Sequence, residues 1–450
     1  LFQVTGKRKY LDLAKYFIDA RGTGENYFLQ EISRGDSGNI FPELSDYRPE
    51  YSQSDRPVRE QEAAEGHAVR AVYMYSAMAD LAYEYQDEEL MAACKRLWNN
   101  IVQRQMYITG GIGASGILER FTVDYDLPND CNYAESCASI GLAMFGIRMA
   151  NITKDASYID TVERALYNTV LAGIALDGKS FFYVNPLEVW PDNCMERTSK
   201  EHVKPTRQKW FGVACCPPNI ARILASMGQY IYSVGETALY VHLFISNEVC
   251  IEMETGEVKV SLETKFPFEN LVRIKVSHVP DGGMTLAVRI PEYAGMYQMT
   301  AKGQLLEYKE EKGYAYLALA QDADISISFE APAKFVRANP KVRADCGKTA
   351  VVKGPLVYCL EEIDNGKNLA ELYVDTEKEI QEVPSELFGG ITELVLQGKR
   401  MEESAWDEKV LYGEHPVKLS DVTLKAIPYA YWNNRGMGEM AVWVKELISG

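Results

Sequence analysis

The sequence lacks several features that would assign the protein to a class at once. No apolar run approaches the roughly 20 residues that a membrane-spanning helix needs. Positive charge is not in excess, because 47 Lys and Arg face 64 Asp and Glu, and the formal net charge is −17. A chain this acidic is poorly suited to nucleic acid or to an anionic membrane. Neutral partners such as sugars stay open.

A disulfide framework is also missing. Nine cysteines are an odd number in a chain of 450 residues, which favours free thiols in a reducing, cytoplasmic compartment. The chain opens with LFQVTG, which carries neither an initiator methionine nor a signal pattern. A natural N-terminus upstream of Leu1, with any targeting segment it contains, therefore stays open.

The first half of the chain has the apolar spacing of helices. A polar loop rich in Gly, Ser, Asp and Pro covers about 23–58. The predicted helices span residues 6–22, 65–85, 87–105, 132–152, 156–174 and 217–234. Helices in sequential pairs with long loops favour an α/α toroid. A closed (α/α)6 barrel needs twelve helices, so about six indicate a smaller architecture or a chain that begins midway through the barrel.

The pattern changes near residue 236 to alternating apolar and polar residues separated by turns. This predicts a β-sandwich over 236–332 and a second β-rich domain over 333–450. The expected fold class is therefore multidomain α + β, with a helical α/α-barrel domain over 1–235 followed by β-sandwich domains. We expect any homodimer contact to involve the β-rich domains.

The segment GIGASG, residues 111–116, matches Gly-x-Gly-x-x-Gly. A dinucleotide fingerprint needs a strand before it and a helix after it. Here a helical pattern precedes and a loop-like pattern follows, which argues against nucleotide binding. We expect the glycines to let a loop fold tightly over a cleft.

Two short segments carry clustered thiols. NYAESCASIG places Glu135 and Cys137 close to a helix start, and WFGVACCPPN places Cys215 and Cys216 in a turn before another helix. One carboxylate and three thiolates form a plausible four-coordinate zinc set. Neither pair is Cys-x-x-Cys, so a helix-capping Glu beside three buried packing thiols is the alternative.

Four further residues are candidates for the site. Glu119, in the glycine loop, could be a general acid whose pKa is raised by burial, or a solvated loop carboxylate. His67, one of five histidines, lies at a helix start and could simply be partly buried with a backbone partner. Glu163 could be a helix-face charge and Tyr183 a core aromatic.

Several motifs occur together in one order. They are YITGGIGASGILERF, DYDLPND, NYAESCASIG, ERALYNTVLAGI, FFYVNPLE and WFGVACCPPNIARILAS. With them the chain resembles glycoside hydrolase family 127, the β-L-arabinofuranosidases. The resemblance covers about 60–235 strongly, and the β-rich remainder fits the family's sandwich domains more loosely.

The resemblance implies a catalytic (α/α)6 barrel, of which the first half is not found here. It implies Zn²⁺ held by Glu135, Cys137, Cys215 and Cys216. It also implies Cys215 as the nucleophile and Glu119 as the acid/base, with net retention at the anomeric carbon. His67, Glu163 and Tyr183 match positions that hold the sugar.

The expected function is thus release of terminal β-L-arabinofuranose, or a related L-sugar, from an oligosaccharide or glycoconjugate. Two other interpretations stay open. One is a non-catalytic carbohydrate-binding or structural protein with an inert zinc cluster. The other is an α/α-toroid lyase or isomerase, in which the thiols would have no role.

Overall fold

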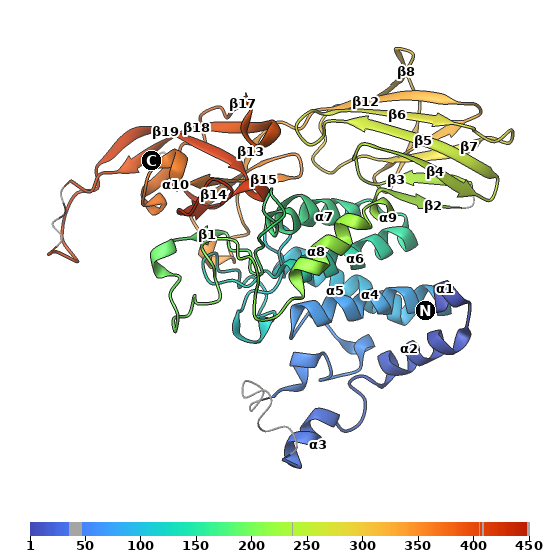
Figure 1. Ribbon diagram of the computed structural model, residues 1–450, viewed down its shortest axis with the longest axis horizontal. Helices are drawn as coiled ribbons and strands as arrows, with labels where there is room; N and C mark the ends of the chain where they lie inside the picture. Colours follow the sequence, from blue (N-terminus) through green and yellow to red (C-terminus); the bar gives the residue numbers. More distant parts are fainter. Residues whose placement is uncertain (36–46, 236, 405, 407–408, 448–450) are drawn as a thin grey trace.

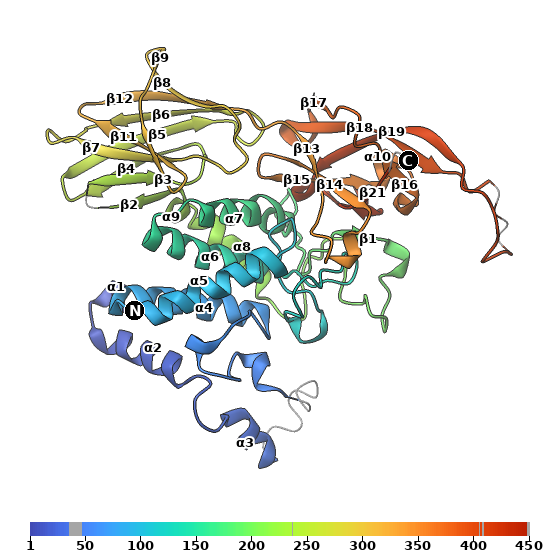
Figure 2. The same cartoon turned by 180° about the vertical axis from the view of Figure 1, so that it is seen from behind.

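A layer of helices lies beneath two β-structures in the computed structural model (Figure 1). The model describes residues 1–35, 47–235, 237–404, 406 and 409–447. The N-terminal helices lie on the side of the helical layer that faces away from both β-structures, as the reverse view also shows (Figure 2). This arrangement confirms the expected fold class of a helical domain followed by β domains. Within the described part of the chain, no helix combines the length and apolar character needed to span a bilayer.

The helices follow the predicted spacing closely at their starts. The longer ones are α2 (Arg8–Ala20), α4 (Ala68–Tyr85), α5 (Glu88–Asn100), α6 (Ser136–Thr153), α7 (Ser157–Ala165) and α8 (Cys216–Ala225). The shorter ones are α1 (Phe2–Thr5), α3 (Tyr27–Ser33), α9 (Gly228–Ile231) and α10 (Glu362–Asn365). Capping explains some of these starts, since the Asp87 carboxylate accepts the Leu90 N–H at 2.9 Å where α5 begins.

One helix and one loop assigned from the sequence need correction. The helix predicted over 217–234 ends at Ala225, and Tyr232–Val234 forms strand β2. This segment is aromatic and β-branched, and pairing with a neighbouring strand outweighs its helical spacing. The polar loop predicted over 23–58 contains α3, and its residues 36–46 lie outside the described residues.

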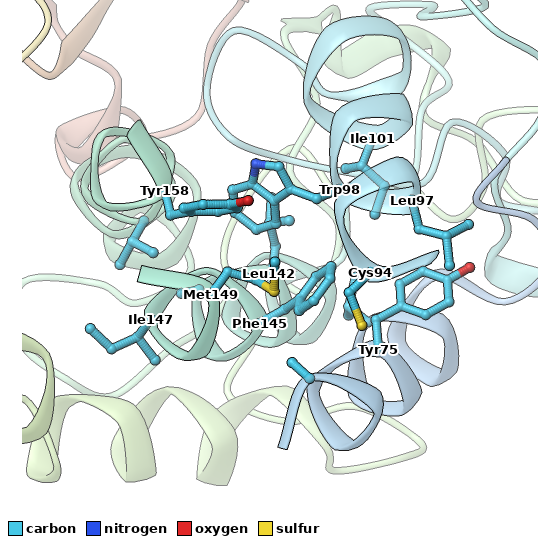
Figure 3. Packing of buried hydrophobic residues seen from close by; sticks show 14 of the residues in the cluster. Tyr75, Cys94, Leu97, Trp98, Ile101, Leu142, Phe145, Ile147, Met149 and Tyr158 are labelled. Carbon is cyan, nitrogen blue, oxygen red and sulfur yellow. The ribbon is translucent and has the colours of Figure 1, made fainter. Parts of the chain in front are cut away.

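Large apolar side chains hold the helical layer together (Figure 3). The Trp98 ring on α5 packs against the rings of Phe145 on α6 and Tyr158 on α7, at centroid distances of 5.3 and 5.0 Å. Tyr75 on α4 contacts Phe145 from the other side, at 5.8 Å. Four helices thus share one core, and α6 is buried along most of its length between its neighbours.

The middle β domain is a sandwich of two sheets. One sheet has the order β10-β11-β7-β3-β2 and the other β4-β5-β6-β12-β8-β9. Strand bounds in the first are β2 (Tyr232–Val234), β3 (Ala238–Val241), β7 (Met284–Arg289), β10 (Lys309–Glu311) and β11 (Tyr314–Leu319). In the second they are β4 (Asn247–Met253), β5 (Gly256–Thr264), β6 (Leu271–Ser277), β8 (Tyr297–Ala301), β9 (Gln304–Leu305) and β12 (Ala323–Phe329). Alternating burial along β6 matches the predicted period of two.

The C-terminal domain is built on a ten-stranded sheet of order β1-β20-β15-β19-β18-β16-β21-β14-β13, with β17 paired to β18. Its edge strand β1 (Glu188–Val189) comes from the helical half of the chain and pairs with β20 (Met440–Ala441). The others are β13 (Lys334–Val336), β14 (Lys348–Lys353), β15 (Leu356–Glu361), β16 (Leu372–Val374), β17 (Gln381–Ser385), β18 (Ile391–Met401), β19 (Leu419–Pro428) and β21 (Val444–Glu446). The C-terminal sheet therefore includes part of the helical half's own chain.

A buried cation joins the sandwich to the helices. The Arg289 guanidinium, at the end of β7, has no exposure and pairs with Asp160 at 2.6 Å and with Glu163, both on α7. Its Nε donates to the His242 carbonyl at 2.7 Å. A buried charge is stable only when it is paired and hydrogen-bonded, so these contacts tie the sandwich to the orientation of α7.

Trp98→Ala should lower the free energy of unfolding by about 3–5 kcal/mol, because a large cavity would open among α5, α6 and α7. Urea unfolding followed by the helical circular dichroism signal would measure the loss. Trp210→Ala is the matched control: this side chain is 63% exposed, so the change should stay within about 0.5 kcal/mol. Equal losses in the two variants would contradict the packing in Figure 3.

His242 should make the fold sensitive to acid. Burial, with Arg289 and Lys154 nearby, lowers the pKa of His242 to about 3 from 6.5. The folded state therefore keeps the imidazole neutral between these values while the unfolded chain protonates it. The stability contributed by His242 is present above pH 6.5 and falls, by up to about 1.4 kcal/mol per pH unit, as the pH drops toward 3.

His242→Gln keeps a polar group for Ser233 and Tyr314, which lie 2.5 and 2.7 Å from the imidazole nitrogens, but does not titrate. Thermal unfolding of parent and variant between pH 7 and 4 should show a shallower decline in the variant. The carboxyls of Asp160 and Glu163 titrate in both proteins, so the difference isolates His242. Parallel curves would show that the imidazole does not titrate as described.

Candidate active site

Two helix starts meet at the thiol cluster. Glu135 occupies the N-cap position of α6 and Cys137 its second residue, while Cys215 is the N-cap of α8 and Cys216 its first residue. The four ligand atoms of these side chains all lie within 4.8 Å of one another. Prolines 217 and 218 fit this geometry, because the first turn of a helix tolerates residues without an N–H. Residues about 80 apart in sequence thus form one group.

The contacts inside the cluster are all between acidic groups. Glu135 Oε1 accepts from the thiols of Cys215 at 3.2 Å and Cys216 at 3.4 Å, and the Cys137 and Cys216 sulfurs are 3.5 Å apart. Glu135 does not act as a helix cap through its side chain. Its second oxygen, Oε2, is buried and has no partner among the described residues. An orphaned carboxylate oxygen beside three sulfurs is a donor set that suits a soft divalent cation.

The pKa shifts within the cluster also favour a bound cation. Burial raises the pKa of Glu135 and of the Cys216 thiol. Hydrogen bonds from Cys137 and Cys216 lower the pKa of Cys215, which is the exposed member of the cluster. The N-terminal ends of α6 and α8 add partial positive charge that favours a thiolate. The protein alone thus favours one ionised sulfur, and a cation would be needed to ionise the others together.

Glu119 lies beside this cluster, held by two donors. The His67 Nδ1 accepts the Arg70 N–H at 3.5 Å, which leaves Nε2 to donate to Glu119 Oε2 at 3.0 Å. The Tyr133 hydroxyl donates to Oε1 at 2.8 Å. Together, with the His67 contact as the largest cause, they lower the pKa of Glu119. The expectation that burial raises this pKa was wrong, because the side chain stays one-third exposed and these donors favour the carboxylate.

The backbone that carries Glu119 is strained. Leu118 and Glu119 have φ values of 60° and 53°, a region that side chains other than glycine rarely occupy. Backbone bridges from Arg120 to Ser115 and His67 hold the turn. A Cβ on Gly116 would meet the His202 ring at 2.8 Å, so this loop packs as closely as the glycine pattern predicts. The segment before it is π-helix and turn, unlike a nucleotide fingerprint.

Two tyrosines connect the carboxyl to the thiols. The Tyr183 hydroxyl lies 2.7 Å from the Cys215 sulfur, and its ring is 6.1 Å from that of Tyr133, which binds Glu119. His67, Glu119, Tyr183 and the four cluster residues therefore come together as one site. Sequence reasoning did not single out Tyr133, although it stands two residues before Glu135 in the same motif.

Glu163 is not brought to this group. Its side chain is completely buried on α7, where it pairs with Arg289 and accepts from the Tyr293 hydroxyl at 2.7 Å. Both partners belong to the middle β domain. The contacts of Glu163 are therefore those of a domain junction.

Comparisons with known proteins support the assignment of the site to a family. Models of a β-L-arabinofuranosidase GH127 catalytic domain, a GH127 middle domain and a family 127 C-terminal domain match residues 1–229, 238–332 and 333–445. The chain belongs to glycoside hydrolase family 127. It is accordingly a glycosidase, and enzymes of this class act on oligosaccharides or glycoconjugates.

Similar proteins extend beyond this chain in length. A non-reducing end β-L-arabinofuranosidase of Bifidobacterium longum subsp. longum is 38% identical over 459 residues, which cover 98% of this chain and 69% of that protein. The crystal structure of a GH127 β-L-arabinofuranosidase from Geobacillus stearothermophilus T6 has a TM-score of 0.93 at 46% identity, covering 99% of this chain and 71% of that one. A second GH127 β-arabinofuranosidase structure has a TM-score of 0.85 at 34% identity, covering 99% and 67%.

Proposed function

We propose that this family 127 member is a zinc-dependent retaining glycosidase that releases terminal β-L-arabinofuranose, or a related L-sugar. Cys215 would be the nucleophile and Glu119 the acid/base. The observation that carries the proposal is an exposed thiol 2.7 Å from the Tyr183 hydroxyl, with the Tyr183 ring against that of Tyr133, which holds the Glu119 carboxyl together with His67. The sugar class rests on the names of the relatives.

Glu135, Cys137, Cys215 and Cys216 would hold the zinc ion. When bound, zinc would lower the pKa of the thiols and keep the sulfurs ionised and in place. The orphaned Oε2 of Glu135 and the mutual distances within 4.8 Å support this assignment.

In the first step the Cys215 sulfur would form a bond to the anomeric carbon as the bond from that carbon to the leaving oxygen breaks. Glu119 would give its proton to this oxygen. The free site favours the Glu119 carboxylate, so a bound sugar must raise its pKa by covering the exposed third of the side chain. Tyr183, 2.7 Å from the sulfur, would orient the nucleophile.

In the second step the Glu119 carboxylate would take a proton from water while the water oxygen attacks the anomeric carbon. The carbon–sulfur bond would break and return the electron pair to Cys215. Two inversions leave the configuration unchanged. Once the leaving group has departed, the hydrogen bonds from His67 and Tyr133 would again favour the Glu119 carboxylate, which is the form that the base role needs.

We propose His67 and Tyr183 as residues that also contact the sugar, since His67 contacts the proposed acid/base Glu119 and Tyr183 contacts the proposed nucleophile Cys215. A sugar contact by Glu163 stays a sequence-based prediction. We further propose three domains over 1–235, 236–332 and 333–450, which the separate sheets and the helical layer support.

Metal analysis of purified protein tests the cofactor. The parent should carry about one zinc ion per chain, and Cys216→Ser should lose most of it because a ligand sulfur is replaced by a weak donor. Cys94→Ser is the matched control, since Cys94 is an equally buried free thiol in the helical core. Equal zinc content in both variants, or a metal-free folded parent, would rule out the four-ligand site.

Kinetics on two substrates test the catalytic roles. Cys215→Ala should abolish turnover, and Glu119→Gln should lower kcat by about 10²–10⁴ on an arabinose disaccharide. The Glu119→Gln loss of kcat/KM, which reports the first step alone, should be much smaller on a nitrophenyl arabinofuranoside, because that leaving group needs no proton. Cys346→Ala, an exposed thiol far along the chain, is the control and should keep parental rates. Similar losses of kcat/KM on both substrates would contradict the acid role of Glu119.

A further inference from the structure

A cavity lies where the three parts of the chain meet. Its volume is about 470 Å³, within the range of small-molecule sites, which favour domain junctions. The helical half contributes Tyr107 and Arg104, the middle domain Glu292, and the C-terminal domain Asp345 and Trp443. None of these residues belongs to the candidate active site.

One polar group of the cavity lining, the Tyr107 hydroxyl, lacks a hydrogen-bond partner in the described part of the chain. Tyr107 is only 2% exposed, and its hydroxyl has no hydrogen-bond partner among the described residues. Buried hydroxyls are almost always paired, and an unpaired one destabilises the fold. Asp345, also buried, lines the same cavity and is held by the Asn129 amide at 2.7 Å. A hydroxyl without a partner among the described residues and a carboxyl thus both belong to residues of the cavity wall.

The charged side chains that line the cavity are Arg104, Arg164, Lys334, Arg337, Glu292 and Asp345. Each of the three arginines is already paired with a carboxylate: Arg104 with Asp124, Arg164 with Glu292 and Arg337 with Glu446. An anion would have to compete with these carboxylates for the three arginines, and Lys334 is the remaining cation among the described residues of the lining. A neutral polyhydroxyl compound could instead use the N–H donors and carboxylate oxygens that the pairs leave free.

Aromatic rings complete the lining. Tyr125, Tyr293 and Trp443 all border the cavity. Ring faces offer apolar contact to the C–H side of a sugar, while the polar groups meet its hydroxyls. We propose that this junction cavity is a second binding site, separate from the catalytic one, for a neutral carbohydrate.

Binding of L-arabinose, measured by saturation-transfer NMR, tests the site. The full chain carries His67→Ala and Cys215→Ala, which remove two proposed active-site contacts. Adding Tyr107→Phe should weaken the remaining binding about three- to tenfold, because the ligand loses one hydrogen bond. Tyr75→Phe is the matched control: it too removes a buried hydroxyl without a partner among the described residues. Tyr75 lies in the helical core (Figure 3) and does not line the cavity, so its loss should leave affinity unchanged.

Each of the following outcomes would contradict the proposed carbohydrate site in the junction cavity. Loss of all binding in the His67→Ala, Cys215→Ala background would mean that only the active site holds sugar, and the proposed hydrolysis would stand. Equal affinities in the Tyr107→Phe and Tyr75→Phe proteins would place the sugar elsewhere. Displacement of L-arabinose by equimolar inorganic phosphate would mean an anion site. Tyr107→Phe in the parent should hydrolyse a nitrophenyl arabinofuranoside at the parental rate, so a failure of the reaction and a failure of the cavity are distinguishable.

Discussion

Four acidic side chains crowd into one space at the starts of two helices, and much of the site depends on how that crowding is relieved. Glu135, Cys137, Cys215 and Cys216 cannot all ionise close together without a cation, yet an ionised sulfur is what makes the group reactive. The N-termini of α6 and α8 supply part of the required positive potential. Burial of Glu135 and Cys216, against the exposure of Cys215, decides which sulfur is reachable.

The remaining architecture holds these two helix starts in position. Helix α6 is fixed by the shared core around Trp98 and Phe145. The loops near α8 are held from the C-terminal domain, where Phe182 stacks on Trp432 at 4.6 Å and Arg207 donates to the Trp432 carbonyl at 2.8 Å. The β domains therefore act on the site at a distance, by constraining the segments that carry Tyr183 and the cysteines.

The pKa of Glu119, on the other side of the site, is controlled in a different way. Glu119 stands on a strained turn, and two donors, rather than burial, set its pKa. Its protonation would then depend on whether a sugar covers it, which couples proton transfer to substrate binding. Arg289, Asp160 and Glu163 form a separate charged group where the sandwich meets the helices. Because these charges are buried, they must stay paired, and the pairing holds the sandwich against α7.

The sequence by itself determined the family, the helix starts and the membership of the thiol cluster. These features are local: apolar spacing follows the helical period, and Glu-x-Cys and Cys-Cys-Pro-Pro each stand at a helix start. Only the tertiary structure decided that Tyr133 and His67 hold Glu119 and reverse its expected pKa shift, and that Glu163 faces Arg289. It also decided that the segment Tyr232–Val234 pairs as a strand. Each of these depends on a partner outside the local segment, some more than 100 residues away, and such contacts leave no periodic trace in a single sequence.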